Sequence, residues 1–198
     1  METMTTLALM HDRTLDLATD QVVAAAAGGA AALTRATPCA GWDLGALLAH
    51  MVGQNHGFAA ALRGEPGDFA PRPGVTAANW NRSVADLRDA RDHPGTDAVL
   101  LPEVSDVDRF PVAMVIGMHA VDSSVHAWDV AASLAEGPGR AWRPDAEVAA
   151  AVLAVASRLP AGEARTRPGA AFAPVLPGTG TDAWGDALAL LGRRGRSA

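Results

Sequence analysis

The sequence predicts a mainly helical fold, an up-and-down helix bundle, and three observations support this class. Apolar residues recur at helical spacing in several long segments, residues that cap helices precede those segments, and runs with strand-like alternation are few. Short to moderate loops separate the segments, which favours helices packed around one core. With 198 residues, 49% of them hydrophobic, the whole chain 1–198 is expected to form a single domain.

The first two predicted helices are bounded by glycines and by a capping aspartate. Residues 5–27 have apolar side chains at helical spacing, and two glycines follow them. The turn-forming segment 37–42 leads to Asp43, whose carboxylate can accept hydrogen bonds from the free amides of a helix. We therefore expect the second helix over residues 44–62.

The next two helices follow loops rich in glycine, proline and charged residues. Residues 63–74 have such a composition, and Thr76 after them can cap a helix that runs to residue 91. Pro111 suits the first turn of a helix, where its missing amide would be unpaired in any case. This predicts a fourth helix from Pro111 to about residue 135.

The C-terminal third predicts two more helices and an irregular segment. Pro144 opens a helix with acidic residues in its first turn, which suit the positive end of the helix dipole, and the helix ends near Pro160. Residues 172–180 are expected to be short and extended or irregular. A capped helix should follow over about 182–191.

Composition excludes several classes of function. All 16 basic residues are arginines, the net charge is -6, and no basic surplus is left to neutralise a phosphate backbone, so we expect no binding to nucleic acid. The arginine bias suggests a GC-rich, actinobacterial genome. No uninterrupted apolar stretch reaches the roughly 20 residues of a membrane span, and no signal peptide is evident. With a single cysteine, Cys39, these features favour a cytoplasmic protein that does not bind membranes.

Three potential metal ligands share one face of the fourth helix. His119, Asp122 and His126 are spaced three and four residues apart, which at about 100° per residue aligns them. Asp122 and His126, one turn apart, can direct a carboxylate oxygen and an imidazole nitrogen toward a common point. For His119 we favour hydrogen bonding within the bundle.

His50 is the best candidate for a third ligand. It lies in an apolar part of the second helix, where an imidazole without a partner would be costly to bury. Three protein ligands leave a coordination position open, as in catalytic sites, and N and O donors suit zinc or a similar divalent ion. The alternative is that His50 and His126 make ordinary hydrogen bonds within the bundle.

Other polar and aromatic residues have weaker functional arguments. Asp129, three residues beyond His126, could orient that imidazole or accept hydrogen bonds from a neighbouring helix end. Arginines of the third helix could bind a carboxylate substrate or be solvated surface charges: Arg82, Arg88 and Arg91. Packing, rim or surface roles are expected for the rest, namely Trp42, Trp128, Cys39 as a structural thiol, His56, His11 and His93.

Four segments resemble a known family. The segments are TPCAGW at 37–42, LAHMVG at 48–53, DSSVHAWDVA at 122–131 and ALLGR at 189–193. They are similar to the DinB-like superfamily, in particular to the mycothiol-dependent maleylpyruvate isomerase metal-binding-domain proteins of actinobacteria. The resemblance implies a DinB-like four-helix bundle with extra C-terminal helices.

The resemblance also implies a metal site and a type of chemistry. Carried over to this sequence, the family's ligands are His50, Asp122 and His126, its metal is zinc, and a thiolate of mycothiol on the metal acts as nucleophile. The function expected on this basis is a mycothiol-dependent transferase or isomerase that acts on a small electrophilic metabolite. Asp129 and His119 are then expected around the ligands.

Two other functions stay open. One is a tailoring enzyme of secondary metabolism that uses the bundle pocket without a thiol, for cyclisation, isomerisation or hydrolysis. The other is a non-catalytic module that binds a metal or a ligand, which a closed four-ligand site including His119 would favour. Small residues on the first helix also permit a homodimer.

Overall fold

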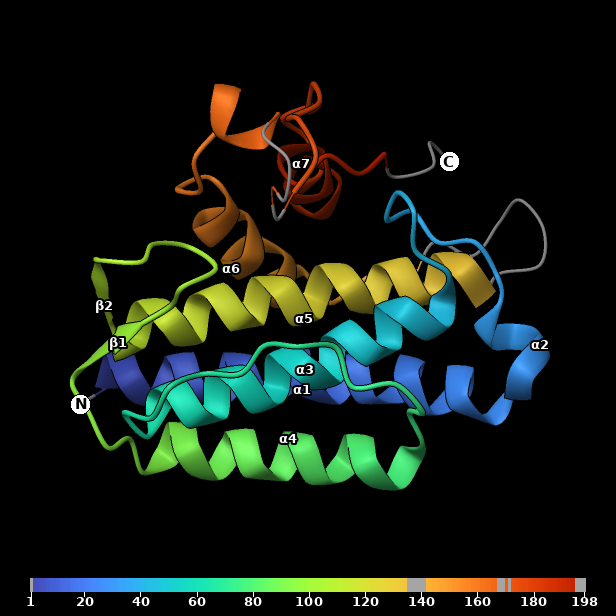
Figure 1. Cartoon of the computed structure of the whole chain (residues 1–198). Coiled ribbons are helices and arrows are strands. Elements are labelled where there is room, and N and C mark those ends of the chain that lie inside the picture. Colours follow the sequence, from blue (N-terminus) through green and yellow to red (C-terminus); the bar gives the residue numbers. More distant parts are fainter. Residues whose placement is uncertain (1, 135–141, 167–169, 171, 195–198) are drawn as a thin grey trace. The chain divides into compact units, whose positions relative to one another are not determined.

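The fold is described from a computed structural model, which covers residues 2–134, 142–166, 170 and 172–194 (Figure 1). The chain divides into two compact units, Met1–Leu134 and Ala135–Ala198. That the two units make up a single domain stays a prediction.

The first unit is a bundle of four long helices, which confirms the predicted all-α class. Its helices are α1 (Glu2–Ala27), the short α2 (Gly29–Leu33), α3 (Leu44–Leu62), α4 (Ala77–Asp92) and α5 (Val112–Leu134). The helix α1 packs against α4 and α5, and α3 packs against the same two helices.

The connection between α3 and α4 sets the directions of the helices. It returns along the length of the bundle, so α3 and α4 run parallel, as α1 and α5 also do (Figure 1). The ion pair between Arg63, directly after α3, and Asp89, in the last turn of α4, reflects this arrangement. Short loops would have favoured antiparallel neighbours throughout, and the length of this connection removes that constraint.

The starts of α3 and α4 agree with the sequence because capping is a local interaction. Asp43 accepts a hydrogen bond from the amide of Ala46 at 2.8 Å. Thr76 and Asn79 form a reciprocal capping box. The two N-termini are thereby fixed, which in turn sets the position of His50 along α3.

A small antiparallel hairpin precedes α5 and differs from the prediction. Strand β1 (Ala98–Leu100) pairs with β2 (Arg109–Pro111), with Val99 opposite Phe110. Pro111 ends β2, and α5 begins at Val112, so the expected place of Pro111 in the first helical turn is wrong. Three-residue strands are too short for an alternating pattern to show in the sequence.

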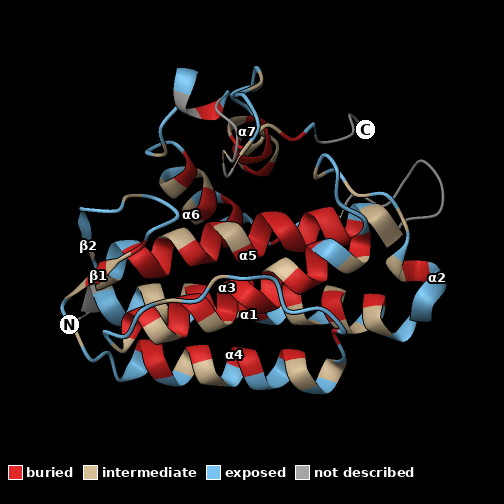
Figure 2. Ribbon diagram, viewed as in Figure 1, coloured by how far each residue is buried: buried red, intermediate tan, exposed pale blue. Residues whose placement is uncertain are grey.

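The core of the first unit lies between the four long helices. Leu15, Leu47, Leu87 and Val125 come one from each helix and are all fully buried. Buried residues cover the inward faces of the ribbons, and α3 and α5 are buried over most of their length (Figure 2). Within the described part of the chain, no helix is both long and apolar enough to cross a membrane.

The second unit contains α6 (Ala146–Ala156), the 3-10 turn η1 (Gly162–Arg165) and α7 (Ala183–Leu190). Asp145 and Asp182 cap the two α-helices, so the predicted start at Pro144 falls two residues early. The helices α6 and α7 pack together. The described residues of 172–180 are irregular, as one of the two expectations had it.

Candidate metal centre

The three predicted ligands come together between α3 and α5. His50 on α3 and the pair Asp122 and His126 on α5 each offer one nitrogen or oxygen atom, and these atoms all lie within 4.8 Å of one another. The Nε2 atom of His126 is 3.4 Å from Oδ1 of Asp122. The rings of His50 and His126 meet edge to face, with centroids 5.1 Å apart. We call these three residues the front ligand set.

The carboxylate and the imidazoles of the front ligand set each stabilise the charged form of the other, which shifts their pKa values. Burial alone would raise the pKa of Asp122, but the facing His126 and His50 outweigh it and hold that pKa below the usual range. Burial would likewise lower the pKa of His126, yet Asp122 and Asp129 raise it well above its ordinary value. Asp122 therefore stays ionised, while a proton would compete with any ion for His126.

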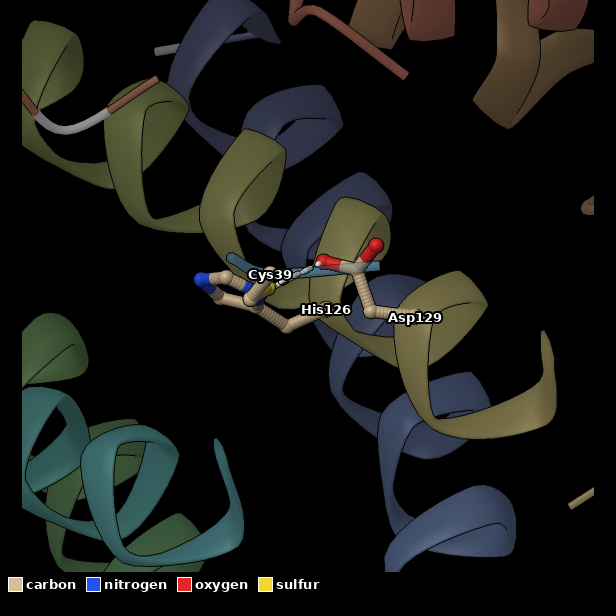
Figure 3. A group of neighbouring side chains, drawn as sticks. All are labelled: Cys39, His126 and Asp129. Carbon is tan, nitrogen blue, oxygen red and sulfur yellow. Dashed lines mark hydrogen bonds and ion pairs between the residues drawn. The ribbon is translucent and has the colours of Figure 1, made fainter. Parts of the chain in front are cut away.

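Asp129 lies behind the His126 ring. Its side chain is fully buried, and its Oδ2 atom is 2.9 Å from Nδ1 of His126 (Figure 3). Asp122 contacts the other ring nitrogen, Nε2. A carboxylate here accepts the Nδ1 proton and leaves Nε2 directed at the front ligand set. Of the two roles considered for Asp129, its position is that of a residue orienting the imidazole.

Cys39 joins the same cluster, which the sequence argument did not foresee. Its Sγ donates to Oδ2 of Asp129 at 3.2 Å and lies 3.9 Å from Nδ1 of His126 (Figure 3). The hydroxyl of Thr37 accepts from the Cys39 amide and holds the turn. One signal was available in the sequence, because Cys39 belongs to the turn that opens the helix of His50.

Trp42, in the same turn, lies against the ligands rather than in the core. Its ring centroid is 4.8 Å from that of His50 and 6.5 Å from that of His126. Of the core or inter-helix packing expected for Trp42, the contacts with rings on α3 and α5 fit the second, since the residue is 37% exposed; Trp128 is 7% exposed and belongs to the core. An exposed aromatic ring thus lies beside the front ligand set.

His119 faces a buried polar chain. Its Nδ1 accepts from Nε2 of His11 at 2.9 Å, and its Nε2 donates to Oδ1 of Asn55 at 3.1 Å. This tautomer is assigned because the amide nitrogen of Asn55 donates to Ser83, which leaves Oδ1 of Asn55 as the acceptor that faces His119. On the far side, Nδ1 of His11 faces the guanidinium of Arg91 at 3.4 Å. This agrees with the hydrogen-bonding role favoured for His119, and no ligand group found among the described residues includes it.

His11 is buried, so the expected surface position is wrong. It is 0% exposed, because the face of α1 that carries it turns toward α5 even though its sequence neighbours are polar. Burial lowers the pKa of His11 well below its ordinary value and lowers that of His119 to about 4. Both rings are therefore neutral near pH 7.

The remaining polar candidates lie apart from the front ligand set. Arg88 and Arg91 form ion pairs with Asp12 of α1 at 2.9 and 2.7 Å. Arg91 is buried and is therefore not a solvated surface charge, whereas Arg88 is half-buried. Arg82 is exposed. His56 lies 3.8 Å from Asp86 on the neighbouring helix, and the side chain of His93 is 79% exposed.

Comparison with known proteins adds an independent finding. The sequence profile of the family described as mycothiol maleylpyruvate isomerase N-terminal domain matches residues 15–131. Comparison with curated proteins and with solved structures gives no match. The matched span is more than half of the chain and includes the front ligand set, Cys39 and Asp129. The chain therefore belongs to the mycothiol maleylpyruvate isomerase N-terminal domain family, within the DinB-like superfamily.

Proposed function

We propose that this protein is a metal-dependent enzyme of thiol chemistry, in which His50, Asp122 and His126 hold one divalent ion. The convergence of these donors from two helices carries the proposal. Two imidazoles and one carboxylate are a donor set that suits zinc, and three protein ligands leave a position open for a substrate or thiol.

The chain's own residues prepare this position. Asp122 remains ionised and supplies negative charge. Asp129 orients the His126 ring so that its Nε2 atom faces Asp122. A divalent ion held there supplies Lewis acidity, which favours the anionic form of a thiol or polarises a carbonyl. The exposed ring of Trp42 offers an apolar surface to a small unsaturated ligand.

The family supports the finer part of the proposal. Its description names mycothiol and maleylpyruvate isomerase, and by analogy the thiol here is mycothiol and the substrate a small electrophilic metabolite that is isomerised or accepts the thiol. Cys39 does not take the part of that thiol, because it lies on the Nδ1 side of His126, away from the front ligand set. Such small-molecule chemistry fits the cytoplasmic location predicted from the sequence.

The position of His119 speaks against a closed, purely structural metal site. Such a site would need a fourth protein ligand, and the sequence offered His119 for it. Both ring nitrogens of His119 are instead used in the buried polar chain. An open, three-ligand site is therefore the better hypothesis.

The metal content of the purified protein tests the proposal. We expect about one zinc ion per chain in the wild type and in His93→Ala, an exposed control, but none in His126→Ala and weakened binding in His50→Ala. Zinc that persists in His126→Ala with unchanged affinity would contradict the assigned ligands. Turnover of small electrophiles should then require both zinc and added mycothiol, whereas zinc-dependent turnover without thiol would favour the tailoring enzyme.

A further inference from the structure

The His126 ring has donors on both of its nitrogen sides. Behind it, Sγ of Cys39, Nδ1 of His126 and Oδ2 of Asp129 form a triangle with sides of 2.9, 3.2 and 3.9 Å (Figure 3). All three residues are buried or half-buried. We call them the rear ligand set.

The triangle has nearly the size that a tetrahedral metal ion requires. With Zn–S bonds of about 2.3 Å and Zn–N or Zn–O bonds of about 2.0–2.2 Å, ligand atoms around zinc are roughly 3.3–3.7 Å apart. The sides of the rear ligand set lie on both sides of that range. Shifts of a few tenths of an ångström would bring the three donors to bonding distance, which side-chain rotation can supply.

We propose that the rear ligand set is a second, alternative binding site for a thiophilic divalent ion of the zinc and cadmium class. The ion displaces the proton of the Cys39 thiol, which is released to solvent. The single ring proton of neutral His126 moves from Nδ1 to Nε2, which faces Oδ1 of Asp122 at 3.4 Å, and Nδ1 then offers its lone pair to the ion. No electrons are transferred. A thiolate and a carboxylate together balance the double positive charge.

The two ligand sets exclude each other because they share His126. A neutral imidazole has one lone pair, so an ion in the front set needs the proton on Nδ1, and an ion in the rear set needs it on Nε2. The protein should therefore hold one ion at a time. Which ligand set is occupied depends on the metal. The thiolate of the rear set favours the softer cadmium ion, whereas the nitrogen and oxygen donors of the front set do not share this preference.

The composition of the chain provides a specific reporter. Cys39 is the only cysteine, so any thiolate-to-metal charge-transfer absorption in the ultraviolet arises from the rear ligand set alone. The proposal goes beyond the proposed function and does not require it, since His50→Ala removes a front ligand and leaves the rear set complete.

Titration of the metal-free full chain with cadmium chloride tests the proposal. In His50→Ala we expect one cadmium ion per chain with the charge-transfer band. In His50→Ala/Cys39→Ser the band should disappear and the affinity should fall by about 100-fold, because the thiolate is lost. Zinc added to Cys39→Ser alone should still bind, which shows that the fold and the front set survive.

Two results would overturn the rear site. One is cadmium bound to His50→Ala without a charge-transfer band, and the other is no cadmium bound to that variant while circular dichroism shows it folded. Neither result depends on zinc binding by the wild type, so failure of the rear site and failure of the proposed function can be told apart.

Discussion

Acid should destabilise the bundle through His119, which is buried in the polar chain between α1, α3 and α5. Its pKa is about 4 in the folded protein and near 6.5 in an unfolded chain. Between these values the unfolded state binds more protons than the folded state. The stability contributed by neutral His119 is therefore complete above pH 6.5 and is lost as the pH falls toward 4.

The size of this effect follows from the two pKa values. Between pH 7 and pH 5, His119 alone should lower the free energy of unfolding by about 2 kcal/mol. That is a large part of the roughly 5–15 kcal/mol that stabilise a typical domain. His11 adds a loss in the same direction, because burial lowers its pKa as well. Exposed Glu103 acts in the opposite sense, since its pKa is raised, and its solvation keeps that contribution small.

Urea unfolding at pH 7, 6 and 5 measures the effect, with a chelator present so that acid release of metal does not contribute. In His119→Gln the side chain no longer titrates, and the loss between pH 7 and 5 should shrink by about 2 kcal/mol. His93→Gln, at an exposed position, should retain the full loss. The same pH dependence in His119→Gln as in the wild type would refute the reasoning.

Three further predictions concern the metal centre and the core. Asp129→Asn should weaken zinc binding about 10–100-fold in a chelator competition, because the amide no longer anchors Nδ1 of His126, whereas Asp106→Asn, at an exposed position, should leave it unchanged. Zinc affinity should fall about tenfold for each unit of pH below the raised pKa of His126, since one proton competes with zinc for the ring. Calorimetry at several pH values measures this slope, and its absence would exclude His126 as a ligand. Leu47→Ala, at a fully buried position, should lower the free energy of unfolding by about 2–5 kcal/mol in urea titrations, and a change below 1 kcal/mol would contradict its place in the core.

Features of the fold that depend on local sequence were predictable. The N-terminal caps of α3 and α4, at Asp43 and Thr76, fall at the predicted residues because a cap involves only the next three residues. The parallel pairing of α3 with α4 was not predictable from loop composition, because it depends on how far the connection travels. The β1–β2 hairpin was missed for a related reason, since each strand has too few residues to show a period.

The residues of the candidate site likewise fall into those that local sequence predicts and those that only tertiary contacts bring together. Helical spacing places Asp122 and His126 on one face of α5, and an apolar setting singles out His50, so the front ligand set could be proposed before any coordinates. Cys39 and Trp42 approach His126 from the turn before α3, which is far from α5 in sequence, and no periodicity relates that turn to α5. The same holds for His11, whose partner His119 lies 108 residues away.

The two sides of the His126 ring differ in whether local sequence or tertiary contact determines them. Its Nε2 side is shaped by a partner one helical turn away and by α3, and this side defines the proposed zinc site. Its Nδ1 side is shaped by Asp129 and by tertiary contact with Cys39. The front set therefore needs the tautomer with the proton on Nδ1, which Asp129 favours. An ion bound by the Cys39 thiolate in the rear set would need the tautomer with the proton on Nε2. In the two proposed sites, the side of this ring that an ion would bind depends on the turn 37–42 as well as on the helices.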